Sequence, residues 1–284
     1  MIVEQVTGPA TYHGEGPVWW ESWGGLRWVD TYAGDILRLG ASGVVERWHV
    51  ADMVTSIRPT AAGGVIMSSE RGILLADEPD GAVRELATPV SDPGQRLNDG
   101  ACDPDGAFWC GTIDQSGKAG GALYRVGQDG LVTTAIREVS ISNGIAWSPD
   151  GGSMYYVDSA SGRIDVFDFT PGGDGSIRNG RPFATVTVEG ATPDGIAVDE
   201  EGGVWVALWN GFGVDHYDAE GRLVDRIQLP VRKVSACTFG GDDLDELYIT
   251  TSREDEPDAH PAAGSVFRAR PGVRGLPTAT FGGV

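Results

Sequence analysis

One pattern of apolar and polar residues recurs along the chain. A stretch of small apolar residues leads into a turn rich in Asp and Gly, then into an aromatic stretch, a second turn and a third apolar stretch. The copy over residues 144–167 has all of these parts, and further copies begin at residues 100 and 195. Short apolar and aromatic stretches bounded by such turns are typical of β-strands. The pattern therefore predicts a chain of many short strands with almost no helix.

The repeat has a regular length. Three weaker copies complete the set, and the six copies are marked by residues 15, 58, 98, 143, 194 and 235. The intervals between the markers are 43, 40, 45, 51 and 41 residues, close to the length of a four-stranded propeller blade. Six copies predict a single all-β domain over residues 1–284, a six-bladed β-propeller whose first strands line a central channel. We expect the N-terminal strand at 2–6 to join the last blade, formed mostly by 235–284, and so close the ring.

Composition agrees with this fold and restricts the partners. The 284 residues include 43 Gly, 16 Pro and 9 Trp, which suits many strands joined by tight turns. The formal net charge of −20 opposes binding to nucleic acid or to an anionic membrane surface, so we expect neither partner. No signal peptide is visible, and no apolar run approaches the ~20 residues that span a bilayer. We expect a cytoplasmic protein that is a monomer or a weak homo-oligomer.

Three features are expected to be structural. Cys102, Cys110 and Cys237 are too few and too scattered for a disulfide framework, so we expect buried free thiols. The Asp-rich segments 103–106 and 149–151 lack the other spaced ligands of a calcium loop and are predicted to be turns. The acidic segment 253–258 is predicted to be a solvated loop on the last blade, with the alternative that it overhangs the channel mouth.

Four polar residues stand in register with the blade period. Glu15, Asn98, Asn143 and Asp194 each come just before the glycines and small residues that open a first strand. A single Asn-Gly or Asp-Gly pair favours a turn, but four in register favour a set of ligands aimed at the channel axis. Carboxylate and amide oxygens suit one divalent cation such as Ca²⁺, Mg²⁺ or Mn²⁺, and Zn²⁺ or Fe²⁺ is an alternative.

These segments carry a resemblance to a known family. The chain resembles the senescence-marker-protein/regucalcin/gluconolactonase family over nearly its whole length, at residues 14–19, 96–100, 141–144, 193–195, 229–231 and 237–241. The resemblance implies a six-bladed propeller that hydrolyses sugar lactones with a central divalent metal. It also implies metal ligands at Glu15, Asn143 and Asp194, and contacts to the sugar at Arg96 and Asn98, with Asn98 beside the metal.

One segment departs from the family pattern. Mammalian members have a longer loop after the Gly-Thr pair that matches residues 111–112, and that loop carries a glutamate that contacts the substrate. Here the loop at 113–120 is shorter and contains no Glu. The identity of the sugar therefore does not transfer, and the change resembles bacterial members that act on aldonolactones.

The expected chemistry is the hydrolysis of such a lactone. A metal with an open position stabilises the negative charge that develops on the carbonyl oxygen. Asp194 is expected to act as general base as well as ligand, with the alternative that it only holds the metal. Arg96 and Asn98 supply hydrogen-bond donors for the hydroxyls and carbonyl of the small-molecule substrate.

Three further residues are possible members of the site. Asp99 is expected to orient Arg96 or a strand end. His13 either reaches the rim of the pocket or is a structural histidine, and Arg58 is a possible additional substrate contact. Two other functions stay open: a broader esterase or phosphotriesterase, and a propeller that binds metal or ligand without catalysis.

Overall fold

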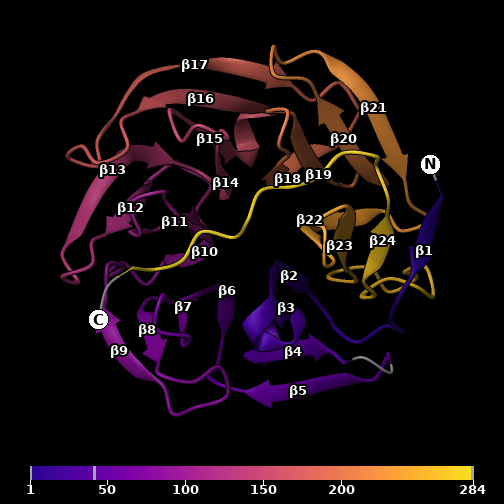
Figure 1. Ribbon diagram of the computed structural model, residues 1–284, viewed down its shortest axis with the longest axis horizontal. Helices are drawn as coiled ribbons and strands as arrows, with labels where there is room; N and C mark the ends of the chain where they lie inside the picture. Colours follow the sequence, from indigo (N-terminus) through magenta and orange to yellow (C-terminus); the bar gives the residue numbers. More distant parts are fainter. Residues whose placement is uncertain (1, 41–42, 283–284) are drawn as a thin grey trace.

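Six four-stranded antiparallel sheets form a ring around a central channel in the computed structural model, which describes residues 2–40 and 43–282 (Figure 1). The predicted six-bladed β-propeller is confirmed. Three one-turn 3₁₀ helices lie at Glu21–Trp23, Thr31–Ala33 and Ser159–Ser161. Within the described residues, no helix is long and apolar enough to cross a membrane.

The strands of each blade are given in order from the channel outward. Blades 1 to 3 consist of β2 (Gly14–Trp20), β3 (Gly25–Asp30), β4 (Asp35–Leu39) and β5 (Val45–His49); β6 (Val54–Pro59), β7 (Val65–Ser69), β8 (Ile73–Ala76) and β9 (Arg84–Ala87); and β10 (Gln95–Cys102), β11 (Phe108–Asp114), β12 (Gly121–Val126) and β13 (Val132–Val139). Blades 4 to 6 consist of β14 (Ser142–Trp147), β15 (Ser153–Asp158), β16 (Arg163–Phe169) and β17 (Ile177–Thr185); β18 (Thr192–Val198), β19 (Val204–Trp209), β20 (Gly213–Tyr217) and β21 (Leu223–Gln228); and β22 (Lys233–Gly240), β23 (Glu246–Ser252), β24 (Phe267–Ala269) and β1 (Val3–Gln5).

The N-terminal strand closes the ring, as predicted. β1 pairs antiparallel with β24, with Val3 opposite Ala269, and so forms the outer edge of blade 6. The other three strands of this blade lie between Lys233 and Ala269, so it is formed mostly by the predicted segment 235–284, although its last strand ends at Ala269. Residues 270–282, the C-terminal segment, leave the blade and cross one mouth of the channel towards blades 2 and 3 (Figure 1). There Phe281 is fully buried, and its backbone N–H donates to Pro59 O at 2.8 Å.

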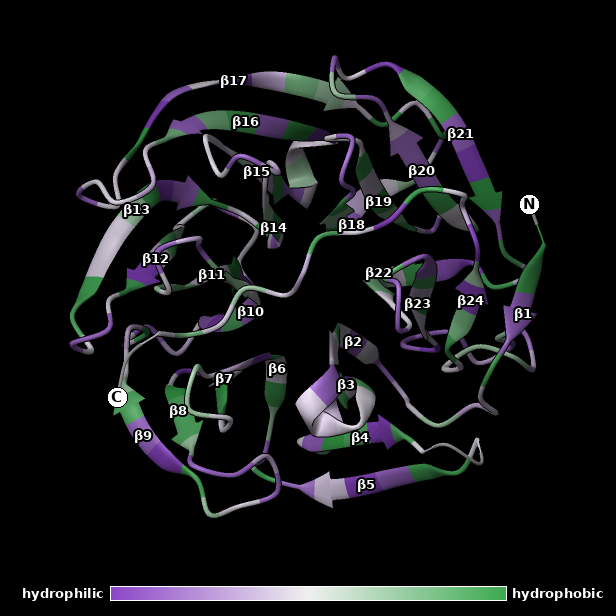
Figure 2. Ribbon diagram, in the orientation of Figure 1, coloured by the Kyte–Doolittle hydropathy of each residue, from purple (hydrophilic) through white to green (hydrophobic). Residues whose placement is uncertain are grey.

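The core lies between neighbouring blades. The outer strands β17 and β21 are largely exposed and carry hydrophilic stretches (Figure 2), whereas β23 is buried along its whole length. Aromatic side chains bridge adjacent sheets: the rings of Trp109 in blade 3 and Trp147 in blade 4 meet edge to face at 5.8 Å. Such pairs remove large apolar areas from water and hold successive blades together.

The Asp-rich turns have a repeated internal structure. The Asp103 carboxylate accepts hydrogen bonds from Ala107 N at 2.8 Å and from Trp109 Nε1 at 2.8 Å. Asp199 accepts an equivalent bond from Trp205 Nε1 at 2.8 Å in blade 5. Each Asp thus ties the turn after the innermost strand to the aromatic residue of the next strand. The prediction that segment 103–106 is a turn is confirmed.

Every innermost strand is irregular near its beginning. The pairing with the second strand shifts between Glu15 and Val18, Val54 and Ser56, Leu97 and Gly100, Ser142 and Ile145, Pro193 and Ile196, and Val234 and Ala236. A bulge leaves residues out of the ladder and redirects their side chains. Because all six irregularities lie at the same depth, they bring residues of six blades to one level of the channel.

Candidate active site at the channel mouth

The bulges surround a cavity of about 240 Å³ at the mouth where the innermost strands begin, called here the site cavity. Four of the predicted residues line it from four different blades: Glu15, Asn98, Asn143 and Asp194. All four side chains are buried. The structure therefore brings together all four polar residues that stand in register in the sequence.

The other two blades present hydroxyl groups at the same level. Thr55 of β6 donates through Oγ1 to Asn98 O at 2.7 Å, and Ser235 of β22 donates through Oγ to Gly14 O at 2.5 Å. These bonds tie the strands that carry the acid and amide groups to their neighbours. Blades 2 and 6 thus brace the site at this level.

The bulge of blade 2 lies three residues before Arg58, the residue at which the sequence repeat predicts it. Thr55, at the bulge of β6, occupies the equivalent position, and Arg58 lies near the end of that strand. Arg58 donates to Ile57 O at 2.6 Å and lines a cavity at the opposite mouth of the channel. The expectation that Arg58 contacts the substrate is therefore not supported by its position.

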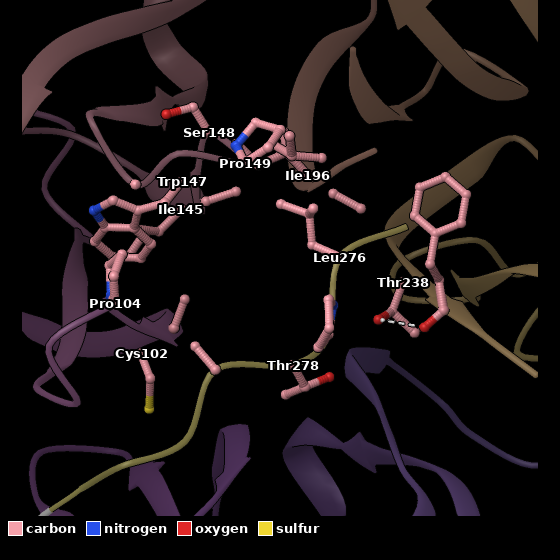
Figure 3. A pocket seen from close by; sticks show the side chains of 18 of the residues that line it. Cys102, Pro104, Ile145, Trp147, Ser148, Pro149, Ile196, Thr238, Leu276 and Thr278 are labelled. Carbon is pink, nitrogen blue, oxygen red and sulfur yellow. Dashed lines mark hydrogen bonds between the residues drawn. The ribbon is translucent and has the colours of Figure 1, made fainter. Parts of the chain in front are cut away.

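The cavity at the opposite mouth is larger, at about 400 Å³, but has a different character. Ile145, Trp147 and Ile196 form apolar walls, and Leu276 of the C-terminal segment lies across it (Figure 3). Among its described lining residues, the charged side chains are only Arg58 and Asp150. Since no group of oxygen ligands converges there, the smaller site cavity is the better candidate for chemistry.

The glycines beside the site are needed for close packing between strands. A Cβ on Gly144 would lie 2.8 Å from Asp194 O, and a Cβ on Gly195 would lie 2.5 Å from the Cβ of Ala236. The innermost strands of successive blades approach too closely for a larger residue. The Asn-Gly and Asp-Gly pairs therefore belong to strands β14 and β18 and do not form turns.

A hydrogen-bond chain determines how the Asn143 amide is oriented. Ser159 Oγ donates to Pro193 O at 2.6 Å, so it accepts the bond from Asn143 Nδ2 at 2.8 Å. The nitrogen is thereby directed away, and Asn143 Oδ1 faces Asn98 Nδ2 at 2.9 Å. An amide oxygen held in this way is preorganised as a ligand.

Arg96 and Asn98 form a connected pair of polar groups. Arg96 Nη1 donates to Asn98 Oδ1 at 2.8 Å and to Leu97 O at 3.0 Å. Asn98 Nδ2 also donates to Ser142 O at 2.8 Å, which determines the orientation of its amide. The Arg96 guanidinium also lies over the Tyr32 ring, with Cζ 5.8 Å from the ring centre, so both residues line the same side of the cavity.

Two buried carboxylates dominate the electrostatics. Burial raises the pKa of Glu15, and the nearby charge of Asp99 adds to this effect. Burial also raises the pKa of Asp194 well above its usual range, with a further contribution from the charge of Glu15. Two acids and an amide oxygen, desolvated together, match the oxygen ligands of a divalent cation. Over the described ranges, no metal-binding cluster of three or more His, Cys, Asp and Glu side chains is found.

Asp99 lies close to the site without lining the site cavity. Its carboxylate accepts a hydrogen bond from Gly100 N at 2.7 Å, and burial raises its pKa while the charge of Arg58 opposes that rise. Among the described contacts, none joins Asp99 to Arg96. Of the two expected roles, the geometry supports holding the strand.

His13 lines the site cavity and is also held structurally. Its Nδ1 lies 2.9 Å from Ser252 Oγ, and its ring meets Trp209 edge to face at 5.6 Å. Burial, together with the charges of Arg96 and Lys233, lowers the pKa of His13 to about 3. The imidazole is therefore neutral at physiological pH. His13 both reaches the pocket and has a structural role, so the two expectations for this residue apply together.

Sequence reasoning missed a second set of lining residues. Tyr32, Ile113, Ile141, Ser159, Thr192, Trp209 and Glu254 complete the site cavity. Several of these lie at or just after the end of the second strand of a blade. Because that strand runs antiparallel to the innermost one, its end lies at the mouth where the innermost strand begins. The acidic segment 253–258 reaches the mouth through Glu254, as the alternative interpretation expected.

The fold and this centre define a class: six-bladed propellers with a buried acidic and amide cluster at one channel mouth. The chain belongs to the SMP-30/Gluconolactonase/LRE-like family, whose model matches residues 13–253. It is 34% identical to regucalcin from Oryctolagus cuniculus over 95% of each chain, and 34% identical to L-arabinolactonase from Azospirillum brasilense over 95% of this chain and 92% of that one. A solved structure of a calcium-binding protein, regucalcin, from Agrobacterium tumefaciens is 28% identical, with a TM-score of 0.92 over 99% of this chain and 97% of the other. The expected family membership is confirmed.

Proposed function

We propose that this protein is a metal-dependent lactonase that hydrolyses a sugar lactone to the sugar acid. The proposal is carried by one observation: two desolvated carboxylates and an oriented amide oxygen share a cavity with the Arg96 guanidinium, which is held by Asn98. Its similarity to an L-arabinolactonase over nearly the whole chain supports the same reaction class.

Glu15, Asn143 and Asp194 would hold the cation. When bound, a divalent cation there polarises a carbonyl group, lowers the pKa of water and keeps both carboxylates ionised. An all-oxygen set suits Ca²⁺, Mg²⁺ or Mn²⁺ better than Zn²⁺ or Fe²⁺, which more often bind His or Cys. The similar regucalcin described as calcium-binding makes Ca²⁺ the first cation to test.

The side chains of the site would have different roles in the hydrolysis. Water oxygen bonds to the carbonyl carbon, the ring C–O bond breaks, and the departing ring oxygen takes up a proton. Asp194 accepts the proton of the attacking water and returns it to the ring oxygen. The Arg96 guanidinium would bind substrate oxygens and orient the ring, while Asn98 is kept in place by Arg96 and Ser142.

A panel of aldonolactones tests the proposal with chelator-treated and reconstituted protein. We expect hydrolysis that depends on added cation and is lost in Asp194→Ala, while the exposed Asp174→Ala control keeps full activity. A bound cation without turnover of any lactone or ester would instead identify a binding protein. Faster turnover of phosphotriesters than of lactones would identify the broader hydrolase.

A further inference from the structure

A third carboxylate enters the site cavity from the side. Glu254 follows β23 and is contributed by blade 6. Among the described residues that line the cavity, the acids are Glu15, Asp194 and Glu254. The first two belong to the proposed cation centre. Glu254 lies outside that set and needs a separate explanation.

The backbone holds Glu254 in position. Its N–H donates to Ser252 Oγ at 3.0 Å, and its carbonyl oxygen accepts a hydrogen bond from Lys233 Nζ. The preceding Arg253 N–H donates to Tyr12 O at 2.9 Å. Lys233 itself lies 4.7 Å from the centre of the Trp209 ring. Although segment 253–258 is acidic, the part that carries Glu254 is anchored at the mouth.

The Glu254 carboxylate has unused capacity to accept hydrogen bonds. Tyr32 donates its hydroxyl to Oε1, and His13 Nδ1 lies 3.5 Å from Oε2. Burial and this hydrogen bond raise the pKa of Tyr32 to about 12, so Tyr32 remains a donor. An ionised carboxylate offers about four acceptor positions. In the described part of the chain, no hydrogen bond to the carboxylate other than that from Tyr32 is found, and the side chain is 21% exposed.

The rest of the cavity explains what this acceptor is suited to bind. Arg96 and Asn98 are contributed by blade 3, which lies across the ring from blade 6 (Figure 1). Tyr32 and Trp209 add aromatic surface to the cavity, and Tyr32 contacts both Arg96 through its ring and Glu254 through its hydroxyl. A ring with several hydroxyl groups can accept from Arg96, donate to Glu254 and place its C–H groups against the aromatic rings. An anionic substituent beside Glu254 would be repelled.

We propose that Glu254 is a specificity-determining residue that selects uncharged, polyhydroxylated lactones by accepting a hydrogen bond from a hydroxyl remote from the ring ester, and that its charge rejects lactones phosphorylated at that end. This inference rests on the proposed lactonase function. A neutral lactone without hydroxyl substituents gains nothing from Glu254, which separates its role from a general effect on catalysis.

The test compares three substrates in the reconstituted holoenzyme: a polyhydroxylated aldonolactone, its phosphorylated counterpart and an unsubstituted lactone of the same ring size. In Glu254→Gln we expect kcat/KM for the polyhydroxylated lactone to fall about 10- to 100-fold, mainly through KM. The unsubstituted lactone should change less than about twofold, and the phosphorylated one should improve. Asp258→Asn, an exposed acid on the same segment, serves as the control and should leave all three unchanged.

The variant Glu254→Asp separates the effect of the negative charge from the effect of side-chain length. It keeps the negative charge but shortens the side chain, so the polyhydroxylated lactone should bind more weakly while the phosphorylated one stays rejected. Equal losses for all three substrates in Glu254→Gln, or no change for any, would overturn the inference. If the wild-type protein turns over no lactone with any divalent cation, the lactonase proposal fails, and the role of Glu254 fails with it.

Discussion

Replacing Glu15 by Gln should stabilise the metal-free protein at alkaline pH while removing its response to metal. In the metal-free state, burial and the charge of Asp99 raise the pKa of Glu15 from 4.5 to about 8. The folded protein therefore holds more protons than the unfolded chain between these two values. Because of this, the free energy of unfolding of the wild-type protein must fall as pH rises through that range.

The size of the effect follows from that pKa. A pKa change of one unit corresponds to about 1.4 kcal/mol. The rise in the pKa of Glu15 therefore means that its ionisation costs the folded state up to roughly 5 kcal/mol at pH 8 and above. The charge of Glu15 also contributes to the raised pKa of Asp194, so the variant relieves part of that cost as well. Against this, a buried Gln amide with incomplete hydrogen bonds costs about 1–3 kcal/mol. We expect a net gain of about 2 kcal/mol for metal-free Glu15→Gln at pH 8.5, and no gain at pH 5.

Urea unfolding from pH 5 to 8.5, with chelator and with Ca²⁺, measures both consequences. A cation at 100 times its Kd should stabilise the wild-type protein by about 2.7 kcal/mol, whereas Glu15→Gln should gain little. The exposed Glu189→Gln should follow the wild-type protein in every condition. A metal-free Glu15→Gln protein that is less stable than wild type at pH 8.5, or a flat pH profile for the wild-type protein in chelator, would refute the reasoning.

Three further predictions concern other parts of the molecule. Ser159→Ala removes the acceptor that orients Asn143 and should weaken cation affinity about 10- to 100-fold, as measured by calorimetry, and unchanged affinity would contradict the ligand role. Phe281→Ala should lower the free energy of unfolding by about 3–5 kcal/mol, because this buried ring anchors the C-terminal segment; a loss below about 1 kcal/mol in denaturant unfolding would show that the segment contributes little. The three buried cysteines should react with a thiol reagent only after unfolding, since burial raises the pKa of Cys110 to about 12 and acts in the same direction on the other two; rapid labelling of the native protein at pH 8 would disprove this.

Much of the architecture is encoded locally and could be predicted from sequence. Each blade is a short run of strands and turns, so the same spacing of apolar stretches recurs six times and gives the number of blades. Glu15, Asn98, Asn143 and Asp194 occupy one position of that repeat. Residues at one position of a repeat lie at one level of a ring, and the structure confirms that they meet.

The predicted position of the site residue in blade 2 is wrong, because it depends on how the strands of that blade pair. The repeat predicts Arg58 at the level of the site in blade 2, but Thr55 is at the bulge of β6. A shift of three residues along a strand moves a side chain about 10 Å, enough to carry it from the level of the site towards the opposite mouth. Sequence spacing near 40 residues cannot resolve such a shift, because turns between strands vary in length by as much.

The sequence by itself determined the fold class, the blade count and the acid and amide residues that meet at the centre, since these follow from a periodic pattern. Only the tertiary structure decided which distant residues complete the cavity. Tyr32 and Glu254 are 222 positions apart in the chain and share a hydrogen bond because β1 closes the ring and makes blades 1 and 6 neighbours. The acidic composition of segment 253–258 fits a solvated loop and a loop that enters a site equally well, so composition alone does not distinguish them. Its position beside the channel mouth makes Glu254 a candidate for substrate selection.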